Sequence, residues 1–94
     1  MTTSNDQPTT LKLRPWEREM ILTETLLDGE LASRLGDALP RQGWSIDLTV
    51  DEIKVIHGFV AHAANHAARK TLRELLAEIL KHLANTAQRH LPRL

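Results

Sequence analysis

Residues 49–83 read TVDEIKVIHGFVAHAANHAARKTLRELLAEILKHL, and this stretch decides the fold. It opens on Thr49 and Glu52, which have the three-residue spacing of a capping box. In that motif the threonine hydroxyl accepts a hydrogen bond from the glutamate backbone N–H, and the carboxylate accepts one from the threonine backbone N–H. The pair therefore predicts a helix that starts at residue 50.

Two apolar stripes follow this helix start, and their phases differ. The first repeats every seven residues at Ile53, Val60 and Ala67. Its continuation would fall on Glu74 and Lys81, which are charged. The slip of two positions equals about 200° around a helix, so one continuous helix would carry the stripes on nearly opposite faces. The second stripe consists of Leu72, Leu76, Ile79 and Leu83.

A break between the two stripes lets both face a single core. We expect it near residues 65–68, because Asn65 tolerates the left-handed conformation that often ends a helix. The sequence therefore predicts a hairpin of two antiparallel helices, over about 50–66 and 69–90. One long helix over residues 50–90 in an extended dimer is the alternative.

The first half of the chain predicts two shorter helices. Pro15 favours a helix over about 15–27, with Leu26 among its apolar positions, and the pair Asp28–Gly29 signals its end. A second helix is expected over 30–39, where Pro40 ends it. Residues 11–13 and 44–48 alternate between apolar and polar side chains, as short strands do.

These elements define one fold class. We expect an all-α, four-helix domain with a long C-terminal helical hairpin and a minor two-stranded β element. Residues 1–10 are polar after Met1 and cannot bury enough apolar area to offset ordering, so they predict a disordered tail. Residues 11–94 are then a single helical domain.

Composition excludes several classes of protein. The chain has no cysteine, which excludes disulfides, thiol nucleophiles and cysteine-based zinc sites. No stretch approaches the roughly 20 apolar residues of a membrane helix, and the N-terminus lacks a signal-peptide pattern. We therefore expect a cytoplasmic protein with no membrane partner. The formal net charge of zero argues against a nucleic-acid partner, because phosphate neutralisation supplies much of that affinity.

Charge is distributed unevenly along the chain. Residues 1–52 hold ten acidic and five basic side chains, whereas residues 53–94 hold two acidic and seven basic ones. Five of these ten acidic residues fall on the first two predicted helices, and five of the seven basic residues of the second half fall on the last. Because these helices must share one small core, we expect the opposite charges to neutralise each other across it.

Two short motifs suggest functions. His62 and His66 have the i, i+4 spacing of a helical zinc pair, but Ala63 stands where the zincin pattern needs its glutamate, so we favour two partly exposed helix residues. Ala32 and Gly36 match two positions in the first helix of a helix-turn-helix. Proline and an alternating segment follow them where a recognition helix should come.

Three segments resemble a group of small uncharacterised bacterial helical domains. They are LKLRPWER at 11–18, LTVDEI at 48–53 and ANH at 64–66, and the resemblance spans residues 11–83. It implies no activity. It does imply a helix break after Asn65–His66 and a structural role for those two residues.

The leading hypothesis is a non-enzymatic interaction module without a cofactor. A 94-residue chain with a wide apolar stripe on its last helix favours sharing that stripe with a second copy, as a homodimer. Another protein is the alternative partner. The rival functions are a DNA-associated regulator and a metal-binding protein through the histidine pair. The expected interface residues are Leu72, Leu76, Ile79 and Leu83.

Overall fold

The computed structural model describes residues 8–90. Helices dominate this part of the chain, and two short strands form an antiparallel sheet, which confirms the predicted fold class. Helices α2, η2 and α3 follow one another without a gap, so they act as one helical run. The elements in chain order are β1 (Pro8–Lys12), α1 (Pro15–Glu24), α2 (Gly29–Ser33), the π-helical turn η2 (Arg34–Ala38), α3 (Leu39–Arg41), β2 (Ser45–Thr49), α4 (Val50–His66) and α5 (Lys70–His90).

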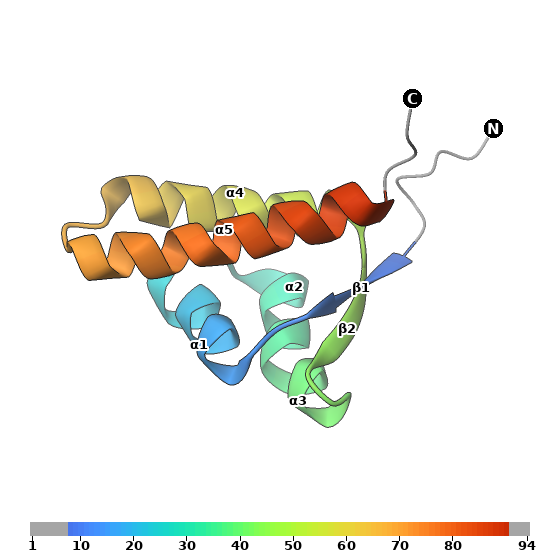
Figure 1. Ribbon diagram of the computed structural model, residues 1–94. Helices are drawn as coiled ribbons and strands as arrows, with labels where there is room; N and C mark the ends of the chain where they lie inside the picture. The colour runs from blue at the N-terminus through green and yellow to red at the C-terminus, as the bar shows by residue number, and fades with distance from the viewer. Residues whose placement is uncertain (1–7, 91–94) are drawn as a thin grey trace.

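The C-terminal half is the predicted hairpin. Helices α4 and α5 lie antiparallel and side by side over the N-terminal elements (Figure 1). The chain turns through residues 67–69, where Ala67 is extended (φ −72°, ψ 127°). Asn65 remains inside α4, so the expected left-handed end at this residue is wrong: α4 ends at His66, and the extended residue Ala67 begins the turn instead.

The capping box sets the start of α4 as predicted. The backbone N–H of Glu52 donates to Thr49 Oγ1 at 3.1 Å, and that of Thr49 donates to Glu52 Oε1 at 2.9 Å. Fixing the first residue of α4 also fixes the phase of its apolar stripe. Ile53, Ile56 and Val60 accordingly point into the core and are fully buried.

The hairpin packs over one apolar core. Both stripes contribute to it, together with side chains from the sheet and the N-terminal helices. The buried hydrophobic residues are Leu11, Leu13, Ile21, Leu27, Leu35, Leu39, Ile46, Leu48, Val50, Ile53, Ile56, Val60, Leu76, Ile79, Leu83 and Ala87.

The two strands pair antiparallel, with Leu11 opposite Ile46. The expected tail over residues 1–10 is wrong at its end, since β1 begins at Pro8 and Thr10 Oγ1 donates to Asp47 Oδ1 at 2.9 Å. Pairing with β2 gives the backbone of residues 8–10 partners that an isolated polar segment would lack. Residues 1–7 lie outside the described part of the chain.

The second helix passes through Pro40 instead of ending before it. Pro40 has no N–H for the carbonyl of Gly36, four residues earlier. The chain widens into η2 just before this point, where the Leu39 N–H bonds the Arg34 carbonyl five residues back. Arg18 Nη1 then donates to the Gly36 carbonyl at 3.2 Å. A π-turn and a side chain from α1 thus accommodate the proline.

The expected ion pairs between the acidic first half and the basic second half of the chain do not form among the described residues. Among the residues that the structure describes, every ion pair joins two residues of the acidic first half. The basic side chains Lys70, Arg73 and Lys81 on α5 are exposed instead. The pairs are Arg14–Glu17 (3.5 Å), Arg18–Glu19 (3.7 Å) and Arg34–Glu52 (3.0 Å).

Candidate interaction surface

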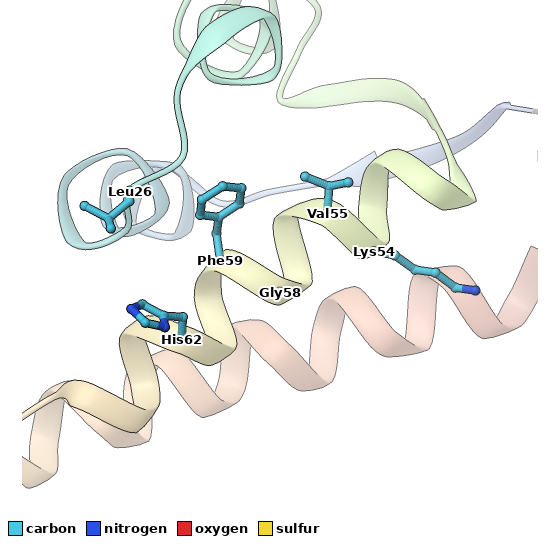
Figure 2. Close-up of a pocket in the computed structure, with 6 residues that line it drawn as sticks. All are labelled: Leu26, Lys54, Val55, Gly58, Phe59 and His62. Carbon is cyan, nitrogen blue, oxygen red and sulfur yellow. The ribbon is translucent and has the colours of Figure 1, made fainter.

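An open cavity lies on the outer side of α4, away from the core. Its volume is about 400 Å³, and it is bounded by α4 and by the turn that follows α1 (Figure 2). Leu26 and Phe59 face each other across it in this view. We call this surface the α4 groove, and its lining residues are Leu26, Lys54, Val55, Gly58, Phe59 and His62.

Leu26 reaches the groove because α1 ends earlier than the sequence predicts. The helix stops at Glu24, and Thr25 closes it: its hydroxyl donates to the Ile21 carbonyl at 2.6 Å and accepts from the Leu27 N–H at 3.2 Å. Leu27 is buried in the core, whereas Leu26 is 75% exposed. The expected place of Leu26 on an apolar helix face is therefore wrong.

Val55 and Phe59 form the other wall of the groove, one turn apart on α4. Val55 precedes the buried Ile56 by one residue, a rotation of about 100° that carries its side chain out of the core. It is 45% exposed, whereas Phe59 is half-buried. Leu26 and Val55 are the large hydrophobic residues that the described chain leaves exposed.

Gly58 lies between Lys54 and His62 on the exposed face of α4 and lines the groove. A glycine inside a helix costs about 0.5–1 kcal/mol relative to alanine. The fold gives no steric reason for it, since a Cβ at this position would meet no atom within 4 Å. The fold of a single chain therefore does not require a glycine at this position.

The histidine pair lies at one end of the groove. The rings of His62 and His66 stand 4.3 Å apart between centroids and are tilted by 54°. His62 also lines a neighbouring cavity of about 290 Å³, together with Leu26, Glu24 and His66. Within residues 8–90, no three histidine or acidic side chains are grouped so as to hold a metal ion. Among the described residues, the histidine pair therefore has no third metal ligand grouped with it.

The predicted interface on α5 lies mostly inside the molecule. The side chains of Leu76, Ile79 and Leu83 have 0% exposed area, and Leu72 is half-buried. The core of one chain already covers this stripe, because α4 and the N-terminal elements pack against it. These residues therefore present almost no surface to a second copy in this fold.

The described part of the chain does not form a helix-turn-helix. The helical run that holds Ala32 and Gly36 continues to Arg41 and then leads into strand β2. In the described chain a strand thus stands in the place of a recognition helix. The basic residues Arg69, Lys70 and Arg73 lie exposed at the start of α5.

A second, more polar cavity of about 320 Å³ lies at the junction of β1 and α1. Two of the polar residues that line it, Glu17 and His82, serve the fold. Glu17 is 1% exposed and accepts a hydrogen bond from the Arg14 backbone N–H at 2.7 Å, which caps α1. His82 of α5 donates through Nε2 to the Lys12 carbonyl, which ties α5 to β1. We therefore interpret this cavity as a structural junction.

Within residues 8–90, no helix is both long and apolar enough to cross a membrane. The chain matches no protein-family model, and neither the curated proteins nor the solved structures include a significant match. The resemblance to small bacterial helical domains stays a prediction. We therefore infer function from the geometry of the α4 groove.

The sequence pattern did not single out the α4 groove. One available signal was Val55, which is apolar but lies outside the stripe of α4. Another was Gly58, a poor helix former inside a strongly amphipathic segment. The exposure of Leu26 had no comparable signal, because it depends on where α1 stops.

Proposed function

We propose that this protein is a non-enzymatic interaction module that self-associates through the α4 groove. One observation carries this proposal: Leu26 and Val55 expose apolar side chains on either side of an open cavity, with Phe59 beside them. Scattered exposed apolar residues are ordinary, but a contiguous group that lines a concavity is typical of a binding surface.

The polarity of the surrounding surface favours a second copy as the partner. Lys54 and His62 line the groove, and Asp51 is exposed one turn before Lys54 on the same helix. One surface thus carries hydrogen-bond donors and a carboxylate acceptor. A two-fold contact needs such a self-complementary patch, because each copy presents the same residues to the other.

The expected affinity is low. Full burial of one Val, Leu or Phe side chain yields about 1.5–3 kcal/mol, and Phe59 is already partly buried. Association costs about 4–15 kcal/mol in lost translational and rotational freedom. The net free energy of association is therefore small. We therefore expect a monomer–dimer equilibrium typical of transient interfaces, which bury less than about 1,200 Å².

Sedimentation equilibrium over a range of protein concentrations tests the proposal. The wild-type chain should shift from monomer towards dimer, and Val55→Asp and Leu26→Asp should both stay monomeric at the same concentrations. Ala77→Asp is the matched control, because Ala77 is exposed on α5, away from the groove. A wild-type chain that stays monomeric at the highest concentration, or a dimer unaffected by both groove variants, would refute the proposal.

A further inference from the structure

We infer that two copies pair antiparallel along α4, with the two-fold axis at Gly58. This inference rests on the proposed function and adds the geometry of the interface. It starts from the position of Gly58, which is the ninth of the 17 residues of α4 and so its midpoint. An antiparallel pair of identical helices whose midpoints cross has its two-fold axis at this residue.

The absence of a side chain at Gly58 fits a crossing point between helices. A glycine there lets two helix backbones approach more closely than larger residues do, and helices in contact lie about 8–10 Å apart depending on the side chains at the crossing. Within one chain the glycine has no steric role, since a Cβ would meet no atom within 4 Å. A close contact with another molecule would explain why this destabilising residue is present.

The face of α4 centred on Gly58 is free to receive a second copy. At 100° per residue, the positions within about 60° of Gly58 form one strip along the helix. Its members are exposed except for Ala61, which is half-buried. They are Asp51, Lys54, Val55, Ala61, His62 and Asn65.

The antiparallel direction is favoured by the charges on this strip. Asp51 lies seven residues before Gly58 and Asn65 seven residues after it, so the axis sets Asp51 of one copy opposite Asn65 of the other. His62 and His66 flank Asn65, so the carboxylate faces an amide and two imidazoles that can donate hydrogen bonds to it. A parallel pair would instead oppose the two Asp51 carboxylates and align both helix dipoles.

The absence of cysteine makes this geometry directly testable by crosslinking. We would introduce single cysteines and treat the protein with a short bis-maleimide at concentrations where the wild type associates. Gly58→Cys should crosslink to itself, because residue 58 lies on the axis. Asp51→Cys should not, because two copies of residue 51 stand about 21 Å apart along the pair, at 1.5 Å per residue. A mixture of Asp51→Cys and Asn65→Cys should give the mixed dimer.

The mixture leaves Gly58 intact, so it tests the register even if Gly58→Cys weakens association. Crosslinking of Asp51→Cys to itself, without the mixed product, would show a parallel pair and overturn the inference. Sedimentation separates this outcome from failure of the proposed function. A dimer that lacks the mixed product would overturn the register alone, whereas a chain that never associates would overturn both.

Discussion

Arg34 and Glu52 connect the N-terminal helical run to the start of α4. Arg34 Nη1 donates to Glu52 Oε2 at 3.0 Å, while Oε1 of the same carboxylate accepts from the Thr49 N–H at 2.9 Å. Arg34 Nη2 also donates to the Asp47 carbonyl in the middle of β2, at 2.8 Å. One guanidinium and one carboxylate thus join three elements at the point where the hairpin begins.

This junction predicts how two substitutions at Thr49 will differ. Thr49→Ala removes the hydroxyl that accepts from the Glu52 N–H and should lower the free energy of unfolding by about 1 kcal/mol, within a range of about 0.5–2 kcal/mol. Thr49→Ser keeps the hydroxyl and should retain most of the stability. Urea unfolding followed by circular dichroism measures both. Equal losses for the two variants would mean that the hydroxyl bond is not what matters at this position.

The burial of the α5 stripe predicts a contrast between two leucines. Leu76→Ala leaves a cavity in the core and should lower the free energy of unfolding by about 2–5 kcal/mol. Leu26→Ala changes an exposed side chain and should alter it by no more than about 0.5 kcal/mol. Urea unfolding at low protein concentration provides the comparison. A stable Leu76→Ala monomer that merely fails to associate would instead favour an interface on α5.

The charges on α5 should contribute little to the fold. Lys81 is exposed, and the ion pairs in the described chain all lie within its first half, so Lys81→Ala should change the free energy of unfolding by about 0.5 kcal/mol or less. Arg34→Ala serves as the comparison, because it removes a half-buried guanidinium with two acceptors. Urea unfolding compares the two variants, and Arg34→Ala should lose more free energy of unfolding than Lys81→Ala. A larger loss of stability for Lys81→Ala than for Arg34→Ala would instead favour charge neutralisation between the two halves of the chain.

Gly58→Ala should have opposite effects on folding and association. Alanine should raise the free energy of unfolding of the monomer by about 0.5–1 kcal/mol, since its methyl group meets no neighbour in the chain. At the crossing point of two helices the same methyl group should weaken the dimer. Urea unfolding of dilute protein and sedimentation of concentrated protein measure the two effects. Tighter association together with higher stability would count against a crossing at Gly58.

The sequence pattern predicts the C-terminal half well because its signals are local. The capping box of Thr49 and Glu52 sets the start of α4, and the phase slip between the two apolar stripes indicates the hairpin. The position of the turn follows from this slip within a few residues, but its backbone conformation does not. An extended residue at Ala67 ends the helix as well as a left-handed asparagine would, and helix propensity does not choose between the two.

The N-terminal half is harder to predict because distant contacts decide its details. Pro40 lies inside a helix because η2 widens before it and Arg18 of α1 supplies a donor to Gly36. Strand β1 starts at Pro8 because β2 pairs with it, which a polar sequence does not reveal. Both outcomes depend on residues far away along the chain.

The α4 groove escapes prediction for a related reason. An apolar stripe of α5 predicted an interface, but whether a stripe is core or surface depends on what the rest of the chain covers. Here one chain covers Leu76, Ile79 and Leu83, and leaves Leu26 and Val55 uncovered. The exposed apolar residues come from two separate elements, so no single periodic pattern contains them.

The most direct test of the proposed interface is a dilution series of amide NMR spectra of the wild-type chain. We expect shifts with concentration at Leu26, Val55, Gly58, Phe59 and His62, which line the α4 groove, and none at exposed Ala77 on α5. Spectra that do not change with concentration, or changes confined to α5, would contradict self-association through this groove.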